Sequence, residues 1–315
     1  MGGYAVEQHT VDGLPGWSLS GPGGLVATFV PDAGMVGCSL TFGGREVLGL
    51  RGGMSTSRDH GSTFGIPLLA PWANRLGDPS YRVGDRQITV TGVPGVHLEE
   101  NGLPIHGLLA AARGWALTES GADDRCAHLV ATLPFDHDRP EFPAFPFQHD
   151  LTVRVEVADN ELTVTTTLTP TGGVAVPVAF GWHPYFCLPG EPRAQWDATL
   201  PFTRRVELDA RSLPTGAVVD VRLPDGPMAD HTYDDLFAGV VNGTRASVSG
   251  GGLRVSLTYV EGYPYAVVFA PAGQDLIAIE PMTAPTDPFS GTFALHEVGP
   301  GKQYTATFAI SVEEV

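Results

Sequence analysis

Hydrophobic and polar residues alternate along much of the chain with the period of two that is typical of β-strands. The clearest case is 148–170, where apolar residues occupy every second position on both sides of Asp159-Asn160. This pattern predicts a long antiparallel hairpin with one buried face. Similar alternation, bounded by Gly, Pro, Asp or Asn, predicts further strands at 25–30, 87–90, 253–260, 266–270 and 304–312.

The helical pattern is missing. No stretch of ten or more residues carries a convincing stripe of apolar side chains at positions i, i+3, i+4 and i+7. The strand-helix rhythm of nucleotide-binding α/β folds is therefore absent. The sequence predicts an all-β fold, a large antiparallel sandwich with few or no long helices.

The domain organisation follows from the continuity of this pattern. Strand-like segments run from about residue 17 to residue 312, and no linker long enough to separate two domains interrupts them. We predict a single domain over residues 1–315. Because 315 residues exceed the usual size of one domain, a division near 170–177 is the alternative.

The charge balance excludes several partners and reactions. The chain has 18 Lys and Arg residues against 35 Asp and Glu residues, and its net charge of −17 leaves no basic cluster for nucleic acid or an anionic membrane. Lys302 is the only lysine; it lies in a turn-like stretch and is followed by Gln303. Schiff-base enzymes need a lysine in a cleft and P-loop enzymes need Lys before Ser or Thr, so neither class is expected.

The cellular location is predicted from cysteines and from apolar segments. Cys38, Cys126 and Cys187 are far apart and form no CxxC motif, which fits a reducing compartment. The first residues, MGGYAVEQHT, show neither a basic start nor an apolar core, and no stretch approaches 18 apolar residues. We expect a cytoplasmic protein; its oligomeric state is not indicated by the sequence.

Five polar residues lie within otherwise apolar segments whose sequence is typical of strands. A buried charge or imidazole costs several kcal/mol unless it is paired or functional. Taken singly, each has a structural reading, such as a hydrogen-bonded core histidine, a buried ion pair or a turn residue. The five are His183 in AFGWHPYF, Glu280 in LIAIEPM, Arg75 in LLAPWANRLG, His106 in GLPIHGLL and Asp234 in TYDDLF.

Taken together, these residues are the components of acid-base chemistry on a polyhydroxylated ligand. A carboxylate can take the proton of an anomeric hydroxyl while a histidine gives one to the ring oxygen. Arginine, aspartate and a second histidine can hold sugar hydroxyls through charge-assisted hydrogen bonds. Trp182 and Tyr185, next to His183, could offer their faces to the apolar side of a sugar ring, with core packing as the structural alternative.

The order of these motifs resembles that of the aldose 1-epimerases, or mutarotases, over nearly the whole chain. The blocks are APWANR with Tyr81 shortly after it, IHG, WHPYF, YDDLF and IEPMTAPTDPF, and the last most resembles a bacterial branch. The resemblance implies a large β-supersandwich of the galactose mutarotase type without metal or organic cofactor. It also implies Glu280 as general base, His183 as general acid, and His106, Arg75 and Asp234 as groups that hold the sugar.

Two departures from the family pattern bear on the substrate. Asp235 follows Asp234 where many relatives have histidine, so either carboxylate could be the ligand; we predict Asp234, which lies three residues before Phe237. The histidine block reads HGL instead of the HGG that is common in galactose mutarotases. Both differences leave the preferred sugar open.

The predicted function is interconversion of the α and β anomers of a free aldohexose. One alternative is an epimerase of a phosphorylated or sulfonated hexose, which would need cations at the mouth of the site; the candidates are Arg45, Arg51, Arg58 and Arg113. Another is a non-catalytic carbohydrate-binding β-sandwich, although Glu280 and His183 as a proton-transfer pair argue against it. A glycoside hydrolase is less favoured, because that chemistry usually needs two carboxylates flanking the bond.

Overall fold

The chain folds almost entirely into antiparallel strands, as the alternating pattern predicts. The computed structural model describes residues 3–55 and 63–315. Within these ranges the strands are joined by loops and by short 3₁₀ turns at Pro31–Ala33, Phe142–Ala144 and Arg193–Gln195. No helix in the described ranges is both long and apolar enough to cross a membrane. The all-β fold is therefore confirmed.

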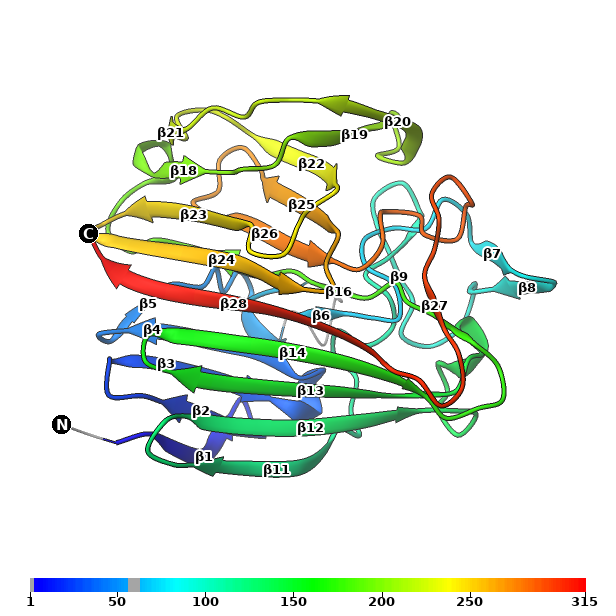
Figure 1. Cartoon of the computed structure of the whole chain (residues 1–315), viewed down its shortest axis with the longest axis horizontal. Helices are drawn as coiled ribbons and strands as arrows, with labels where there is room; N and C mark the ends of the chain where they lie inside the picture. Colours follow the sequence, from blue (N-terminus) through cyan, green and yellow to red (C-terminus); the bar gives the residue numbers. More distant parts are fainter. Residues whose placement is uncertain (1–2, 56–62) are drawn as a thin grey trace.

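A nine-stranded antiparallel sheet runs across the whole molecule and forms the front layer in Figure 1. Its centre is the predicted hairpin, in which inward residues are buried and outward residues are half-buried. The strands are, in spatial order, β11 (Ala116–Ala122), β12 (Ala127–Phe135), β13 (His149–Ala158), β14 (Glu161–Pro170), β28 (Tyr304–Glu314), β24 (Leu253–Glu261), β23 (Arg245–Gly250), β18 (Asp197–Thr199) and β21 (Gly226–Pro227).

A five-stranded sheet packs behind one half of this layer, against β11, β12 and β13. Its third strand has the bounds that the alternation predicts, residues 25–30. The strands are β1 (Ala5–Val11), β2 (Leu14–Ser20), β3 (Leu25–Val30), β4 (Val36–Phe42) and β5 (Arg45–Glu46).

An eight-stranded sheet packs behind the other half, and Trp182 meets Phe308 of β28 there with ring centroids 5.9 Å apart. Strand β17 (Tyr185–Phe186) pairs with β26 beside the main path. The strands of the path are β20 (Pro214–Asp220), β19 (Arg204–Leu208), β22 (Tyr233–Ala238), β25 (Tyr265–Ala270), β26 (Ile277–Met282), β16 (Gly181–Trp182) and β6 (Leu68–Leu69).

Three two-stranded ribbons complete the fold beside the main sheets. They are β7 (Ser80–Val83) with β8 (Arg86–Thr89), β9 (His97–Leu98) with β10 (Pro104–Ile105), and β15 (Val176–Pro177) with β27 (Glu297–Val298). The largest hydrophobic cluster takes buried residues from Leu19 to Val312, so it includes chain on both sides of 170–177.

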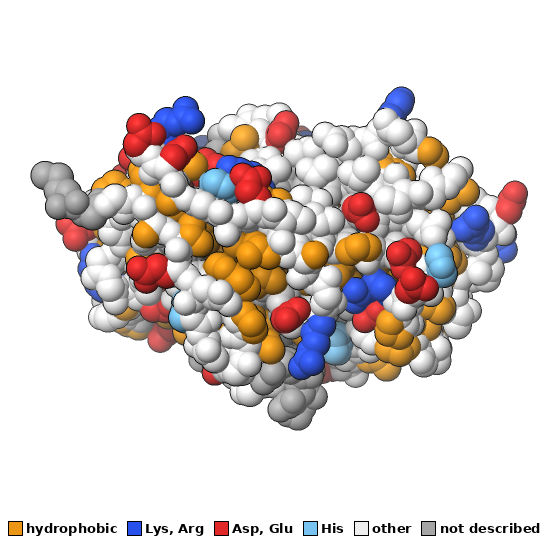
Figure 2. Space-filling model, turned by 90° about the horizontal axis from the view of Figure 1, so that it is seen from below, with side chains coloured by type: hydrophobic (Ala, Val, Ile, Leu, Met, Phe, Trp, Pro, Cys, Tyr) orange, Lys and Arg blue, Asp and Glu red, His pale blue; other side chains and the backbone are white. Residues whose placement is uncertain are grey.

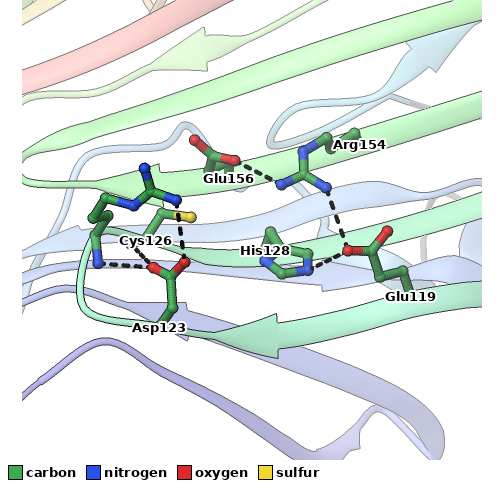
Figure 3. A network of polar contacts seen from close by, with 7 residues as sticks. Glu119, Asp123, Cys126, His128, Arg154 and Glu156 are labelled. Atoms are coloured by element: carbon green, nitrogen blue, oxygen red, sulfur yellow. Dashed lines mark hydrogen bonds and ion pairs between the residues drawn. The ribbon is translucent and has the colours of Figure 1, made fainter.

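The outer surface is polar and carries charges of both signs. Seen from below, acidic and basic side chains are scattered over the surface, several of them beside another charged side chain, with hydrophobic side chains between the groups (Figure 2). On the outer face of β11, β12 and β13, His128 contacts Glu119 at 2.8 Å, and Arg154 lies 3.8 Å from Glu119 and 2.8 Å from Glu156 (Figure 3). This part of the exposed face therefore carries charges that pair with one another, and threonine pairs such as Thr165 with Thr307 lie further along the sheet.

Candidate active site

A cavity of about 510 Å³ gathers six of the seven predicted site residues. It lies on one face of the eight-stranded sheet and is bordered by the β9–β10 ribbon. A hollow of about 560 Å³ on the outer face of the nine-stranded sheet contains none of them, and its charged lining includes Arg254 and Glu313, which pair at 3.3 Å. The predicted residues that line the first cavity are Glu280, His183, His106, Arg75, Asp234 and Tyr185.

Strand register places the two carboxylates of the cavity on one face of the sheet. Asp234 of β22 pairs with Phe269 of β25, and Phe269 pairs with Ala278 of β26. Side chains two residues apart along a strand share a face, so Glu280 lies on the same face as Ala278. Asp234, Phe269 and Glu280 therefore all point into the cavity.

The same alternation separates the two adjacent aspartates. Asp235 pairs with Val268, whose side chain is in the main core, and it contacts Arg205 at 3.5 Å. Only Asp234 of the two lines the cavity. The geometry therefore favours Asp234 as the ligand-holding carboxylate.

Glu280 and His183 form the centre of the site. Glu280 Oε1 lies 3.1 Å from His183 Nε2, and the side chains are 2% and 6% exposed. Burial raises the pKa of the Glu280 carboxyl well above its usual range, and the charge of Asp234 adds to this effect. Burial lowers the pKa of the His183 imidazole well below its usual range, and the nearby His106 and Arg51 act in the same direction. Both pKa shifts favour the neutral forms of the two side chains. Without a ligand, the pair therefore holds one titratable proton, which is on Glu280 when both side chains are neutral.

Each partner of this pair has a second polar atom that is buried. Glu280 Oε2 and His183 Nδ1 have no hydrogen-bond partner among the described residues. A buried polar atom without a partner costs about 1–3 kcal/mol, which a folded protein tolerates mainly where a ligand or water completes the bonding. The site is therefore polar and incomplete, as a binding site for a hydroxylated ligand needs to be.

His106 and Arg75 are positioned by a close approach of two backbone segments. Gly107 adopts a φ of 69°, and a Cβ there would lie 2.2 Å from the carbonyl oxygen of Ala70, so only glycine permits this approach. The His106 amide donates to the Asn74 carbonyl at 2.8 Å. Burial and the Arg75 guanidinium lower the pKa of His106 to about 3, so its imidazole is neutral at physiological pH.

Tyr185 lines the cavity, but its hydroxyl already has protein partners. It lies 3.1 Å from His183 Nε2, 2.6 Å from Thr63 Oγ1 and 3.1 Å from the Arg51 guanidinium. Its ring stacks on the His183 imidazole with centroids 4.1 Å apart. Tyr185 therefore contacts His183 both through its hydroxyl and through its ring.

Trp182 differs from the prediction. Its side chain is fully buried in the main core, and its Nε1 donates to Thr166 Oγ1 at 2.9 Å. Strand β16 ends at Trp182, and the side chains of Trp182 and His183, the next residue, lie in different places, the first in the core and the second in the wall of the cavity. The predicted contact between the Trp182 ring and a sugar does not fit this geometry.

Several lining residues were not predicted as ligand-holding groups. Phe269 and Asn74 line the cavity, and the β9–β10 ribbon contributes His97, Glu99 and Glu100 at its rim. Glu99 is bound within its own turn, where it accepts hydrogen bonds from the amides of Asn101 and Leu103. Sequence alternation could have suggested the inward face of β25, but only the register shows that Phe269 meets Asp234.

The arrangement provides an acid-base pair, hydrogen-bond donors and one aromatic wall, Phe269. No group of three or more His, Cys, Asp or Glu side chains in residues 3–55 and 63–315 is arranged to hold a metal ion. The Glu280–His183 pair can take up and release protons, which suits a ligand with several hydroxyls.

Known proteins of similar structure cover the whole chain. A galactose mutarotase-like protein from Clostridium acetobutylicum matches with a TM-score of 0.86 and 19% identity over 99% of both chains. An aldose epimerase homologue from C. elegans matches with a TM-score of 0.76 and 19% identity over 99% of this chain and all of the other. A galactose mutarotase-like protein from Lactobacillus casei gives a TM-score of 0.71 and 16% identity over 98% of this chain and all of the other.

These structures share the fold of this chain at an identity too low to assign its substrate. Comparison with curated proteins gave no match. The family model of aldose 1-epimerase matches residues 37–311, which include every residue of the cavity. The chain therefore belongs to the aldose 1-epimerase family.

Proposed function

We propose that the protein is an aldose 1-epimerase that interconverts the α and β anomers of a free aldohexose. The observation that supports this most strongly is the buried pair of Glu280 Oε1 and His183 Nε2, 3.1 Å apart in the wall of the cavity. A carboxylate and an imidazole at this separation can reach the anomeric hydroxyl and the ring oxygen of one sugar, which are bonded to the same carbon.

The reaction needs two proton transfers that balance each other. Glu280 takes the proton of the C1 hydroxyl, His183 gives its Nε2 proton to the ring oxygen, and the bond between C1 and the ring oxygen breaks. Rotation about the C1–C2 bond then presents the other face of the aldehyde. The C5 hydroxyl attacks that face while both protons return, so enzyme and sugar are restored with C1 inverted.

The pKa shifts suit these roles. A carboxyl with a raised pKa is a stronger base once ionised, and an imidazole with a lowered pKa is a stronger acid once protonated. The proton that the pair shares in the free enzyme becomes the proton that His183 donates. Asp234, Arg75 and the neutral imidazole of His106 surround the pair and would hold sugar hydroxyls through hydrogen bonds.

The charges of the cavity support a neutral sugar over an anionic one. Arg51 directs its guanidinium to Tyr185, and Arg45 pairs with Glu314 at 3.4 Å. Arg113 does not line the cavity, and Arg58 lies outside the described residues. The rim carries Glu100, which is exposed and would repel a phosphate or sulfonate group.

Polarimetry on freshly dissolved α-glucose and α-galactose tests this function. We expect catalytic amounts of the protein to accelerate the decay of optical rotation and Glu280→Gln to remove the acceleration. Glu119→Gln is the matched control, because Glu119 also contacts a histidine but lies on the outer face of the nine-stranded sheet.

The outcomes separate the candidate functions. Faster mutarotation of glucose 6-phosphate than of glucose would favour the anionic-sugar epimerase. Sugar binding by calorimetry without acceleration of any aldose would favour the non-catalytic carbohydrate-binding protein. Full activity of Glu280→Gln would show that the assignment of the base is wrong.

A further inference from the structure

Behind His183, three segments of the chain meet in a closed ring of backbone hydrogen bonds. The Gly49 amide donates to the Tyr185 carbonyl at 2.9 Å, the Tyr185 amide donates to the Gly65 carbonyl at 2.9 Å, and the Gly65 amide donates to the Gly49 carbonyl at 3.2 Å. Arg51 and Thr63 each lie two residues from a member of this ring. The ring therefore fixes the positions from which Arg51, Thr63 and Tyr185 project.

The side chains from these segments converge on one atom, the Tyr185 hydroxyl oxygen. Thr63 Oγ1, His183 Nε2 and the Arg51 guanidinium all lie within 3.1 Å of it. The Arg51 guanidinium carbon also lies 5.2 Å from the centre of the Tyr185 ring. Arg51 has a φ of 46°, a left-handed backbone that residues other than glycine seldom adopt. So many contacts on a single hydroxyl, at the cost of an unusual backbone, indicate a specific role.

The hydrogen-bond donors and acceptors around the Tyr185 hydroxyl limit what it can do. Arginine can only donate, so the Tyr185 oxygen accepts from Arg51, and the single Tyr185 proton goes either to Thr63 or to His183. When His183 Nε2 carries a proton, it can donate that proton to Glu280 Oε1, 3.1 Å away, or to a sugar, and Tyr185 donates its own proton to Thr63. When Nε2 has lost its proton, Tyr185 can turn its own proton toward Nε2. The Tyr185 hydroxyl therefore has an acceptor in both protonation states of His183, and it gives Nε2 a hydrogen bond once the proton has left.

We propose that Arg51, Thr63 and Tyr185 form a positioning relay that holds the His183 imidazole and matches it in both protonation states. This inference rests on the proposed function, because it assigns the relay to the general acid of the epimerase reaction. The three residues do not touch the reacting atoms in this scheme. They keep Nε2 aimed at the place of the ring oxygen while its proton leaves and returns.

Other groups also face His183 and have to be kept constant in a test. Glu280 contacts Nε2 from β26, the His106 ring lies 5.6 Å away edge to face, and Phe269 of β25 lies 6.0 Å away. Of these, Glu280 and His106 titrate. Variants of Arg51, Thr63 and Tyr185 leave both of them in place.

The first experiment removes the Tyr185 hydroxyl and keeps its ring. Tyr185→Phe retains the stacking on His183, so we expect kcat for mutarotation to fall about tenfold to a hundredfold, the usual effect of losing a hydrogen bond to a charged group, with KM within about twofold. Tyr304→Phe is the matched control: Tyr304 also gives its hydroxyl to a protein acceptor, the Gly262 carbonyl, and does not line the cavity. It should leave kcat unchanged.

Two further changes separate positioning from simple structural support. Thr63→Val, which removes the hydroxyl, should lower kcat. Thr63→Ser, which keeps the hydroxyl, should retain the kcat of the wild type. Arg51→Gln removes a positive charge that lowers the pKa of His183, so the limb of the pH profile of kcat/KM that reports the imidazole should move to higher pH by at least about 0.3 units. A structural defect would lower the rate at every pH and would leave both limbs where they are.

A spectroscopic measurement keeps this inference separate from the proposed function. In protein with ¹⁵N-labelled histidine, the ¹⁵N chemical shift of His183 Nε2, identified by the loss of its signal in His183→Gln, depends on the hydrogen bond to the Tyr185 hydroxyl and should change in Tyr185→Phe. If the wild type accelerates no aldose, the proposed function fails, and this spectrum still decides whether the hydroxyl holds the imidazole. An unchanged spectrum, or a Tyr185→Phe enzyme with full kcat and an unmoved profile, would overturn the relay.

Discussion

Residues 3–55 and 63–315 include two contacts between a histidine and a glutamate, and they differ chiefly in their exposure to water. His128 meets Glu119 at 2.8 Å on the outer face of the nine-stranded sheet, with side chains 18% and 58% exposed. His183 meets Glu280 at 3.1 Å in the cavity, with side chains 6% and 2% exposed. The distances are alike, and burial is the largest cause of the perturbed pKa values of the second pair, with the charges of Asp234, His106 and Arg51 acting in the same direction.

The surroundings of the two pairs differ in the same way. On the surface, Arg154 lies close to Glu119 and pairs with Glu156, and water can reach the remaining atoms (Figure 3). In the cavity, one nitrogen of His183 and one oxygen of Glu280 have no partner among the described residues. The surface pair is complete within the folded protein. The buried pair is completed only by a ligand or by water.

The largest effect is expected from removing the histidine of each pair. His183→Gln should lower kcat/KM for mutarotation by about a hundredfold to ten-thousandfold, the usual contribution of a positioned general acid. His128→Gln should retain the rate of the wild type within about twofold. Polarimetry with both variants at equal concentration measures the difference, and equal losses would show that the comparison has no functional meaning.

The next effect distinguishes the two adjacent aspartates of β22. Asp234→Asn should lower kcat/KM about tenfold to a hundredfold, because an amide replaces the carboxylate in a charge-assisted hydrogen bond to the sugar. Asp235→Asn should leave kcat/KM near that of the wild type and should cost at most about 1 kcal/mol of stability, through its contact with Arg205. Reversed rates for the two variants would assign the ligand to Asp235.

The sequence predicted strands best where one face of a strand is buried and the other is not. The two strands of the 148–170 hairpin alternate in burial, and the sequence shows the same period of two, whereas residues 25–30 were predicted with the right bounds although five of the six are buried. Strand β26 is buried at all six positions, and β16 and β17 have two residues each, so no periodicity marks them. The wall of the cavity is built from such strands.

The site residues were predicted through the resemblance to a family rather than from spacing. His183 and Glu280 are almost a hundred positions apart, and the pairing of β16 and β17 with β26 brings their neighbourhoods together. Trp182 was predicted at the site because it is next to His183, yet its side chain is buried in the core and donates to Thr166, so adjacency in the sequence does not bring it to the cavity. Arg51 was considered only as a cation for anionic sugars. Its contact with Tyr185 depends on the hydrogen bonds that join the segments at Gly49, Gly65 and Tyr185, and no local sequence pattern predicts those.

A third prediction concerns stability and its dependence on pH. The pKa of Glu280 in the folded protein is raised, so its contribution to stability is present below the unfolded pKa, near 4.5, and is lost as pH rises through the folded pKa. Glu280→Gln removes this loss, and should stabilise the protein by about 1–3 kcal/mol at pH 8 and by much less at pH 4.5. Urea unfolding at both pH values measures this. Glu119→Gln is the control and should show no such gain, and equal effects of Glu280→Gln at both pH values would contradict the prediction.

The smallest effect is expected within the surface network. A double-mutant cycle with Glu119→Gln and Arg154→Gln isolates the contact of 3.8 Å between these two side chains, and its coupling energy should be below about 0.5 kcal/mol. In about 1 M NaCl the coupling should vanish, because the screening length then falls to about 3 Å. A coupling above about 1.5 kcal/mol that persists in salt would mean that the surface charges act as a buried network does. Exposure would then no longer separate the two histidine–glutamate contacts, and the incomplete hydrogen bonding of His183 and Glu280 would have to account for the difference alone.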